Sequence, residues 1–342
     1  MSDQKGRQMS FGDMELSGRS TKETFLDKVN EIIDWTPIER ILRRKYKKKA
    51  AADGRPAYPA LPMFKMLLIQ RWYNLSDPAL EAAMCDRISF LRFVGFSLES
   101  SIPDETTICR FRNALAKRNL FGRLLSEINK QLEANGLLVR NGEIVDAGLI
   151  ASSRRPRKVI DIMPEDRKEG QTGPESESYK VSYSDDVEAA WVRKGNTPHY
   201  GYKMHMAVAP QGFVLGGHVT PANVSDTSEF TRLVGNLGLC RGADLFADKG
   251  YTSAKNRDFL ERCGYRDGIM YRAVRGRPLD ENQKDFNKRI GKIRYKVEQG
   301  FGTLKRQYGL FRARYVGKVK TQAEFLLAVT AFNIKKAVNM AF

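Results

Sequence analysis

Three acidic residues that lie far apart in the chain are the side chains best suited to chemistry. Asp146 follows the strand-like run 142–145, Asp248 follows the apolar run 243–247, and Glu298 stands in a basic stretch near the C-terminus. Carboxylates without histidine or cysteine beside them are the ligands that Mg²⁺ and Mn²⁺ prefer. Two such ions held by three acids would activate a water or a 3′-hydroxyl and stabilise the leaving oxygen of a phosphoryl transfer. The acids therefore predict a catalytic metal site if the fold brings them together.

The basic stretch, residues 294–306, carries a single acid among its cations. Its apolar residues recur at three- and four-residue steps, which predicts a helix with one buried stripe. That stripe consists of Val297, Phe301 and Leu304. Four residues turn a helix through roughly 400° and seven through roughly 700°, so Arg294, Glu298 and Lys305 share another stripe. A solvated salt-bridged face is the simpler alternative, as a turn or helix cap is for each aspartate, but the combination favours catalysis.

The charge of the chain indicates a polyanionic partner. Its 342 residues include 58 Lys and Arg against 40 Asp and Glu, which gives a net charge of +18. Nucleic acid is the leading candidate, and an anionic membrane is the second. The sequence has no apolar run near the roughly 20 residues of a membrane-spanning helix. The polar start also lacks the apolar core of a signal peptide. We therefore expect a soluble cytoplasmic protein that binds nucleic acid.

Cysteine and histidine are not spaced for the common zinc or nucleophile sites. The four cysteines include no Cys-x-x-Cys pair, which argues against both zinc and a disulfide framework. The three histidines lie in a strand-rich region without a Ser or Cys partner in a nucleophile motif. The acids remain the better candidates for chemistry.

The first part of the chain is predicted to be helical. Residues 1–19 have the composition of a mobile tail, and residues 20–136 show helical periodicity. One helix of this region has a polar face of residue types that contact DNA grooves and phosphates: Thr107, Arg110, Asn113 and Lys117. This predicts a helix-turn-helix, with plain bundle packing as the alternative. The run Arg43, Arg44 and Lys45 is predicted to contact phosphates, or else to be a solvated helix end.

From residue 137 the pattern changes to strands and helices. Residues 137–320 predict an α/β domain with a mixed sheet of five strands, followed by a packing helix at 321–342. The long polar segment 152–196 lacks core periodicity and is predicted to be a loop. The aspartates are placed at strand ends, where α/β proteins form their sites. On the strand after the loop, Lys203 and His205 face one way and are predicted to contact DNA.

These motifs resemble those of a known family, the DDE transposases of bacterial insertion sequences, and most closely the insertion sequence 5 family. The resemblance covers nearly the whole chain. The motifs are residues 73–77 and 101–107 in the helical region, Val145-Asp146-Ala147, Asp248-Lys249-Gly250-Tyr251, and Arg294-x3-Glu298-x6-Lys305. The signature of the family often has Tyr three residues before its Arg, where this sequence has Gly291.

The resemblance implies a ribonuclease H-like catalytic core preceded by an all-α DNA-binding region. Asp146, Asp248 and Glu298 would be catalytic and would hold two Mg²⁺ or Mn²⁺ ions, while Arg294 and Lys305 would hold phosphates. The partners implied are double-stranded DNA, as terminal inverted repeats and target, and a second copy in a homodimer with paired ends. The setting implied is a bacterial cytoplasm, in association with the nucleoid.

Two alternatives keep part of this prediction. A catalytically silent DNA-binding regulator would keep the basic surface without needing three acids. A nuclease of the same fold would cleave DNA without rejoining it. The 49 residues between Asp248 and Glu298 (298 − 248 − 1) leave little room for a large inserted β-subdomain.

Overall fold

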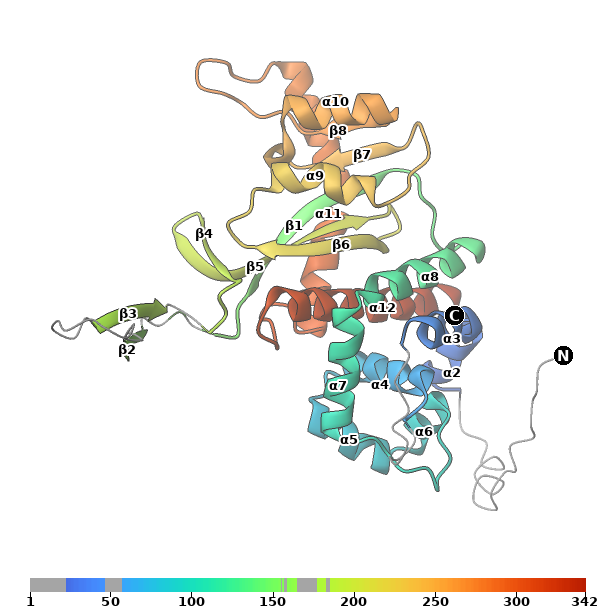
Figure 1. The fold of residues 1–342 in the computed structure, drawn as a ribbon. Helices are drawn as coiled ribbons and strands as arrows, with labels where there is room; N and C mark the ends of the chain where they lie inside the picture. Colours follow the sequence, from blue (N-terminus) through green and yellow to red (C-terminus); the bar gives the residue numbers. More distant parts are fainter. Residues whose placement is uncertain (1–22, 47–56, 155, 157–158, 165–176, 183–184) are drawn as a thin grey trace.

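The described part of the chain consists of a group of helices followed by a mixed sheet with helices on both faces (Figure 1). The computed structural model describes residues 23–46, 57–154, 156, 159–164, 177–182 and 185–342. The predicted mobile tail, residues 1–19, lies outside this part of the chain. No helix of the described residues is long and apolar enough to cross a membrane.

Six strands form the main sheet. They are β1 (Glu143–Ala151), β4 (Ala190–Lys194), β5 (Thr197–Val208), β6 (Val214–Pro221), β7 (Asp244–Ala247) and β8 (Arg266–Ile269). β1 pairs antiparallel with β5 and parallel with β7, and β7 pairs parallel with β8. β4 and β6 both pair antiparallel with β5, along different parts of its length. The mixed α/β core expected from the sequence is therefore confirmed, with one strand more than predicted.

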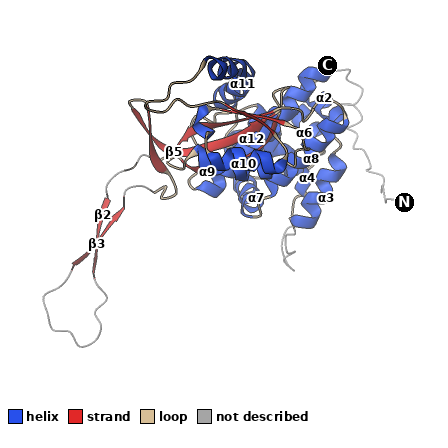
Figure 2. Ribbon diagram, turned by 90° about the horizontal axis from the view of Figure 1, so that it is seen from above, coloured by secondary structure: helices blue, strands red, loops and turns tan. Residues whose placement is uncertain are grey.

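The segment 152–196 is not the featureless loop that its composition predicted. β4 lies inside it and pairs with β5, while β2 (Val159–Pro164) and β3 (Glu177–Ser182) form a separate hairpin that projects from the body (Figures 1 and 2). The side chains of β4 are exposed or half-buried, and Trp191 is 54% exposed. A strand that buries neither face lacks the alternation by which strands are predicted.

Helices cover the two faces of the sheet in different ways (Figure 2). α9 (Asp226–Gly235) and α10 (Ala254–Cys263) lie on one face, and α11 (Glu281–Gln307) lies on the other. The predicted apolar stripe of α11 is buried against the sheet. A Cβ on Gly148 of β1 would come within 2.9 Å of the ring of Phe301. Because Gly148 has no side chain, α11 lies directly on β1, which is the strand that carries Asp146.

Seven helices are described before the sheet, in the region predicted to be helical. They are α2 (Phe25–Ile32), α3 (Trp35–Lys45), α4 (Ala60–Trp72), α5 (Asp77–Asp86), α6 (Ile88–Val94), α7 (Glu105–Lys117) and α8 (Leu120–Ala134). Ten residues separate α6 from α7 (105 − 94 − 1), whereas the motif joins its helices by three or four. The connection before α7 is therefore longer than the turn of that motif, and a helical face shows polarity but not the length of the turn before it. Recognition of DNA by α7 stays a prediction.

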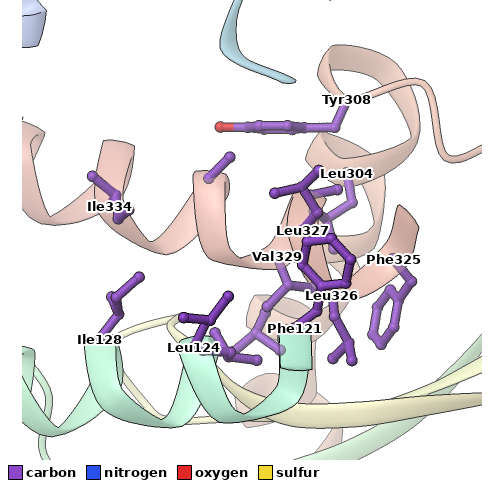
Figure 3. Packing of buried hydrophobic residues seen from close by; sticks show 14 of the residues in the cluster. Phe121, Leu124, Ile128, Leu304, Tyr308, Phe325, Leu326, Leu327, Val329 and Ile334 are labelled. Atoms are coloured by element: carbon purple, nitrogen blue, oxygen red, sulfur yellow. The ribbon is translucent and has the colours of Figure 1, made fainter. Parts of the chain in front are cut away.

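The last helix, α12 (Lys318–Ala341), joins the helical group to the sheet. It contacts α4, α7 and α8 on one side and β6 on the other. Its apolar side chains, among them Leu326 and Ile334, pack against Phe121, Leu124 and Ile128 of α8 (Figure 3). A buried ion pair, Arg71 Nη1 to Glu324 Oε1 at 3.1 Å, connects α4 to α12. The helix predicted at 321–342 is thus present; it begins three residues earlier, at Lys318, and most of its side chains from Thr321 onward are buried.

Side-chain amides cover the free edge of β6. The side chain of Asn333 accepts from Val214 N and donates to Val214 O. Gln322 likewise accepts from Val219 N and donates to Gly217 O, and Asn129 of α8 donates to the carbonyls of Val214 and Leu215. Unpaired strand edges attract other strands. Here these amides satisfy the edge and fix the helices to it.

Candidate active site

The register of two parallel strands places the first two acids side by side. Val145 of β1 lies beside Ala247 of β7, and this is the last pair between the two strands. The next residues are Asp146 and Asp248, and neighbours at one level of a parallel pair point to the same face. Asp146 is not at a strand end as predicted, since β1 continues to Ala151. It stands instead at the end of the pairing between β1 and β7.

One arginine of α11 contacts both aspartates. Arg294 Nη2 donates to Asp146 Oδ2 at 2.8 Å, and Nη1 lies 3.7 Å from Asp248 Oδ1. The side chains of Arg294 and Asp146 are only 11% and 17% exposed. Asp146 also accepts from the backbone N–H of Ala147 at 2.8 Å. The structure thus brings the side chains of Asp146, Asp248 and Arg294 together.

Burial governs the acidity of Asp146. It raises the pKa of this carboxyl above its ordinary value, although Arg294 and the Ala147 N–H act in the opposite direction. The neighbouring charge of Asp248 raises the pKa of Asp146 further. The charged form of a carboxyl group that is removed from water and lies beside a second carboxylate is stabilised by a nearby positive charge. In this structure Arg294 supplies that charge, and its Nε atom is buried without a hydrogen-bond partner.

Glu298 lies in the same cleft, one helical turn beyond Arg294. The cleft has a volume of about 680 Å³, and its lining includes the three predicted acids and both predicted cations: Asp146, Asp248, Glu298, Arg294 and Lys305. Glu298 itself is exposed on the wall. Among the described residues, no three acid, histidine or cysteine side chains are close enough to hold one metal ion together. The shared stripe of α11 predicted from the sequence faces this cleft.

Two family models match the chain. One, "Transposase domain (DUF772)", matches residues 14–114, and the other, "Transposase DDE domain", matches residues 169–334. The transposase for insertion sequence element IS1106 from Neisseria meningitidis serogroup B is 38% identical over 233 residues, 67% of this chain and 77% of that protein. The chain belongs to the DDE transposases of insertion sequences. Asp146 falls between the two matched segments. The matches do not name the insertion sequence 5 family.

Solved transposase structures resemble this transposase only weakly. A piggyBac transposase synaptic complex with hairpin DNA has a TM-score of 0.39 at 10% identity, covering 92% of this chain and 73% of that chain. The Mos1 transposase paired-end complex with left transposon end has a TM-score of 0.21 at 8% identity, covering 88% and 95%. Likenesses of this size carry no argument about the site.

DDE transposases use divalent metal ions, and the acids of this transposase provide the type of ligand atom that such ions bind. Asp146 and Asp248 offer oxygen ligands and already converge on one positive group. Oxygen ligands alone match the preference of Mg²⁺ and Mn²⁺. The exposed Glu298 lies on the wall of the same cleft as these two aspartates.

Other polar residues of the cleft were missed by sequence reasoning. Lys194, His199 and Asp226 line it with the predicted set. Asp226 is the first residue of α9, after the cap residue Ser225, and it pairs with Lys203 at 2.9 Å. Lys194 lies on β4, inside the predicted loop. No spacing signal marks any of the three, since the pairing of β4 with β5 brings Lys194 and His199 to the cleft and α9 brings Asp226 to Lys203 of β5.

The two residues of β5 predicted to contact DNA are both engaged within the protein. His205 is 0% exposed, bonds to Thr220 Oγ1 at 2.9 Å and stacks on the ring of His218. Its burial lowers the pKa of His205 to about 3. The prediction of a DNA contact was therefore wrong for His205, because both faces of β5 are covered. Lys203 is 13% exposed and is held by Asp226.

The remaining predicted DNA contacts lie on the helical part of the transposase. Arg110 and Lys117 of α7 are exposed, and Thr107 and Asn113 are half-buried. On α3, Arg43 pairs with Glu39 at 3.0 Å, and Arg44 lines a hollow between α3 and α8. Lys45 is the last residue of α3, and its side chain lies outside the described part. Contact of these residues with DNA stays a prediction.

Proposed function

We propose that this transposase binds the terminal inverted repeats of its element, cleaves at the ends and joins them to target DNA. Asp146, Asp248 and Glu298 would be its catalytic acids. One observation carries the proposal. Two acids from parallel strands share a half-buried arginine in a cleft that also contains Glu298. We place the transposase in the insertion sequence 5 family on the motifs quoted above.

The same three acids would hold two Mg²⁺ or Mn²⁺ ions. When bound, such ions lower the pKa of the attacking water or hydroxyl and neutralise charge on the leaving oxygen. The residues of the chain bind and orient DNA around that centre. Arg294 neutralises the paired aspartates, and with that charge supplied by ions its guanidinium is available to a phosphate of the DNA.

Lys305 and Lys194 provide the positive charge of the outer cleft. Burial, and then the nearby charge of Lys194, lowers the pKa of Lys305. A phosphate placed between two lysines stabilises both ammonium groups and is itself held in position. Phe301 and Phe311 supply the apolar part of the same wall, which limits the access of water.

The proposed reaction has two steps, cleavage and joining. In cleavage, a water oxygen bonds to the phosphorus at the end of the element and the 3′-oxygen leaves as a hydroxyl. In joining, that 3′-hydroxyl bonds to a target phosphorus and a target 3′-oxygen leaves. Two ends must be joined together, so we propose a homodimer that pairs them in the cytoplasm of a bacterium, on its nucleoid.

A strand-transfer assay tests this function. The DNA that flanks the coding sequence supplies the end duplex, and a supercoiled plasmid with Mg²⁺ serves as target. We expect cleaved ends and joined product. Cleavage without joining would make the protein a nuclease, and end binding without either product would make it a regulator.

A further inference from the structure

We infer that duplex DNA also follows a second path outside the catalytic cleft, across helix α8. This path, which we call the α8 track, consists of two hollows that share Ser126. The inference rests on the proposed function only in taking DNA as the polyanion. Neither hollow shares a lining residue with the catalytic cleft.

The first hollow lies between α3 and α8 and has a volume of about 400 Å³. Four cations line it against one acid, Glu127; they are Arg40, Arg44, Arg123 and Lys130. Arg40 and Arg44 are one turn apart on α3, and Arg123 and Lys130 are two turns apart on α8. All four side chains are exposed. Such spacing aligns the charges of each helix on one stripe, toward the groove between them.

The second hollow, of about 620 Å³, lies where the turn between α7 and α8 meets β6 and the ends of α9 and α12. Its lining contains four cations and no acid: Lys117, Arg140, Arg232 and Lys318. Arg140 and Arg232 are paired with Glu133 and Glu229. Ser126 connects this hollow to the first on the exposed side of α8.

Most of the cations of the α8 track lack a partner of opposite charge. Within the part of the chain that the structure describes, ion pairs involve none of the following: Arg44, Lys117, Arg123, Lys130 and Lys318. Like charges gathered on one face repel one another. An incoming polyanion removes that repulsion and releases its own counterions.

The surroundings of the α8 track favour DNA over a protein partner. A peptide would be expected to add a strand to the edge of β6, but the amides of Gln322, Asn129 and Asn333 occupy that edge. Residues 122 to 130 span about 12 Å of helix axis, which is the rise of three to four base pairs. The hollows on each side extend that length. The track therefore fits a short run of duplex phosphates.

The experiment compares a track variant with a matched control. Arg123→Gln combined with Lys130→Gln removes two cations from the α8 track. Lys255→Gln combined with Arg262→Gln removes two exposed cations from α10, which Figure 1 shows at the far end of the sheet. Binding is measured by anisotropy against KCl concentration, with labelled end duplexes of about 20 and about 50 base pairs, where only the longer reaches beyond the cleft.

We expect the longer duplex to bind wild-type protein more tightly than the shorter one. In the track variant the affinity for the longer duplex should fall about tenfold or more at about 0.1 M salt, while the affinity for the shorter one stays the same. The slope of log affinity against log salt concentration should become smaller in magnitude by about 1.8. The control variant should bind the longer duplex as tightly as wild type does. Wild type, track variant and control should all cleave the shorter duplex at the same rate. An unchanged affinity of the track variant for the longer duplex, or an equal loss in the control, overturns the inference.

A second readout uses the wild-type protein alone. Lysine acetylation followed by peptide mass spectrometry should show that the longer duplex protects Lys117, Lys130 and Lys318 but not Lys255. Equal labelling with and without DNA at the three track lysines would also overturn the inference. If the wild-type protein cleaves neither duplex, the proposed function fails. The dependence of affinity on duplex length and the protection of lysines from acetylation still test whether DNA binds the α8 track.

Discussion

At the scale of single residues, the central feature is an arginine held between two acids. Arg294 was found from its spacing to Glu298, because helical period alone places them on one stripe. That it would contact Asp146 and Asp248 depended on the register of β1 and β7, which no local pattern reveals. Asp226 and Lys194 were missed for the same reason, since α9 and the pairing of β4 with β5 bring them to the cleft.

The first prediction concerns the acids. Asp146→Ala, Asp248→Ala and Glu298→Gln should each reduce strand transfer by a thousandfold or more, about 4 kcal/mol in the barrier, because a metal ligand is lost. End binding should change little. Asp244→Asn, which removes the pair of Asp244 with Arg266 at the start of β7, serves as the control. Strand transfer near the wild-type rate in any of the three variants would contradict the assignment.

The second prediction concerns His205, whose burial lowers its pKa from 6.5 to about 3. The unfolded chain binds a proton at this side chain below about pH 6.5, while the folded protein does not. Stability is therefore lost as pH falls from 6.5 toward 3, by about 2 kcal/mol at about pH 5. Urea unfolding at about pH 6.5 and at about pH 5 should show a smaller loss of stability in His205→Gln than in wild type. The same pH dependence in the variant would contradict the assignment to His205.

At the scale of elements, α11 was predicted well because its period is long and regular. Residues 297, 301 and 304 are buried as the sequence indicated. β4 and the extent of β1 were not predicted. β4 carries no apolar alternation, and the second half of β1 is mostly half-buried. Elements with one clear buried face can thus be predicted from sequence, whereas strands held by pairing alone cannot.

The third prediction tests how closely α11 must lie on β1. Gly148→Ala would place a Cβ 2.9 Å from the ring of Phe301, so helix and strand must separate. We expect a loss of about 1–3 kcal/mol in unfolding free energy and a fall in strand transfer, although all three acids remain. Chemical denaturation and the strand-transfer assay measure the two effects.

The control for this substitution lies on α11 itself. A Cβ on Gly291 would meet nothing within 4 Å, so Gly291→Ala should be neutral or stabilise the helix by up to about 1 kcal/mol. Full activity in Gly148→Ala would show that the acids tolerate a shift of α11. Loss of activity in both variants would point to helix flexibility instead of packing.

At the scale of the whole molecule, α12 makes the helical group and the sheet one structure. Its sequence predicts a packing helix because it is apolar, but a helix buried on most sides has no stripe that identifies its neighbours. The contacts with α4, α8 and β6 come from tertiary structure. The helical group and the catalytic cleft are therefore expected to unfold together.

The fourth prediction tests that coupling through the ion pair of Arg71 and Glu324, whose side chains are both 0% exposed. Glu324→Leu leaves a buried guanidinium without its partner, which should cost about 3–5 kcal/mol. Calorimetry should show one thermal transition in wild type and two in the variant, since the group containing α4 loses its attachment first. Arg71→Met added to Glu324→Leu removes the fully buried charge and should recover part of the stability, since the backbone N–H of Arg314 still lacks its acceptor Glu324. A single transition with an unchanged midpoint in Glu324→Leu would mean that apolar packing alone holds α12, and the two parts would then be coupled without this pair.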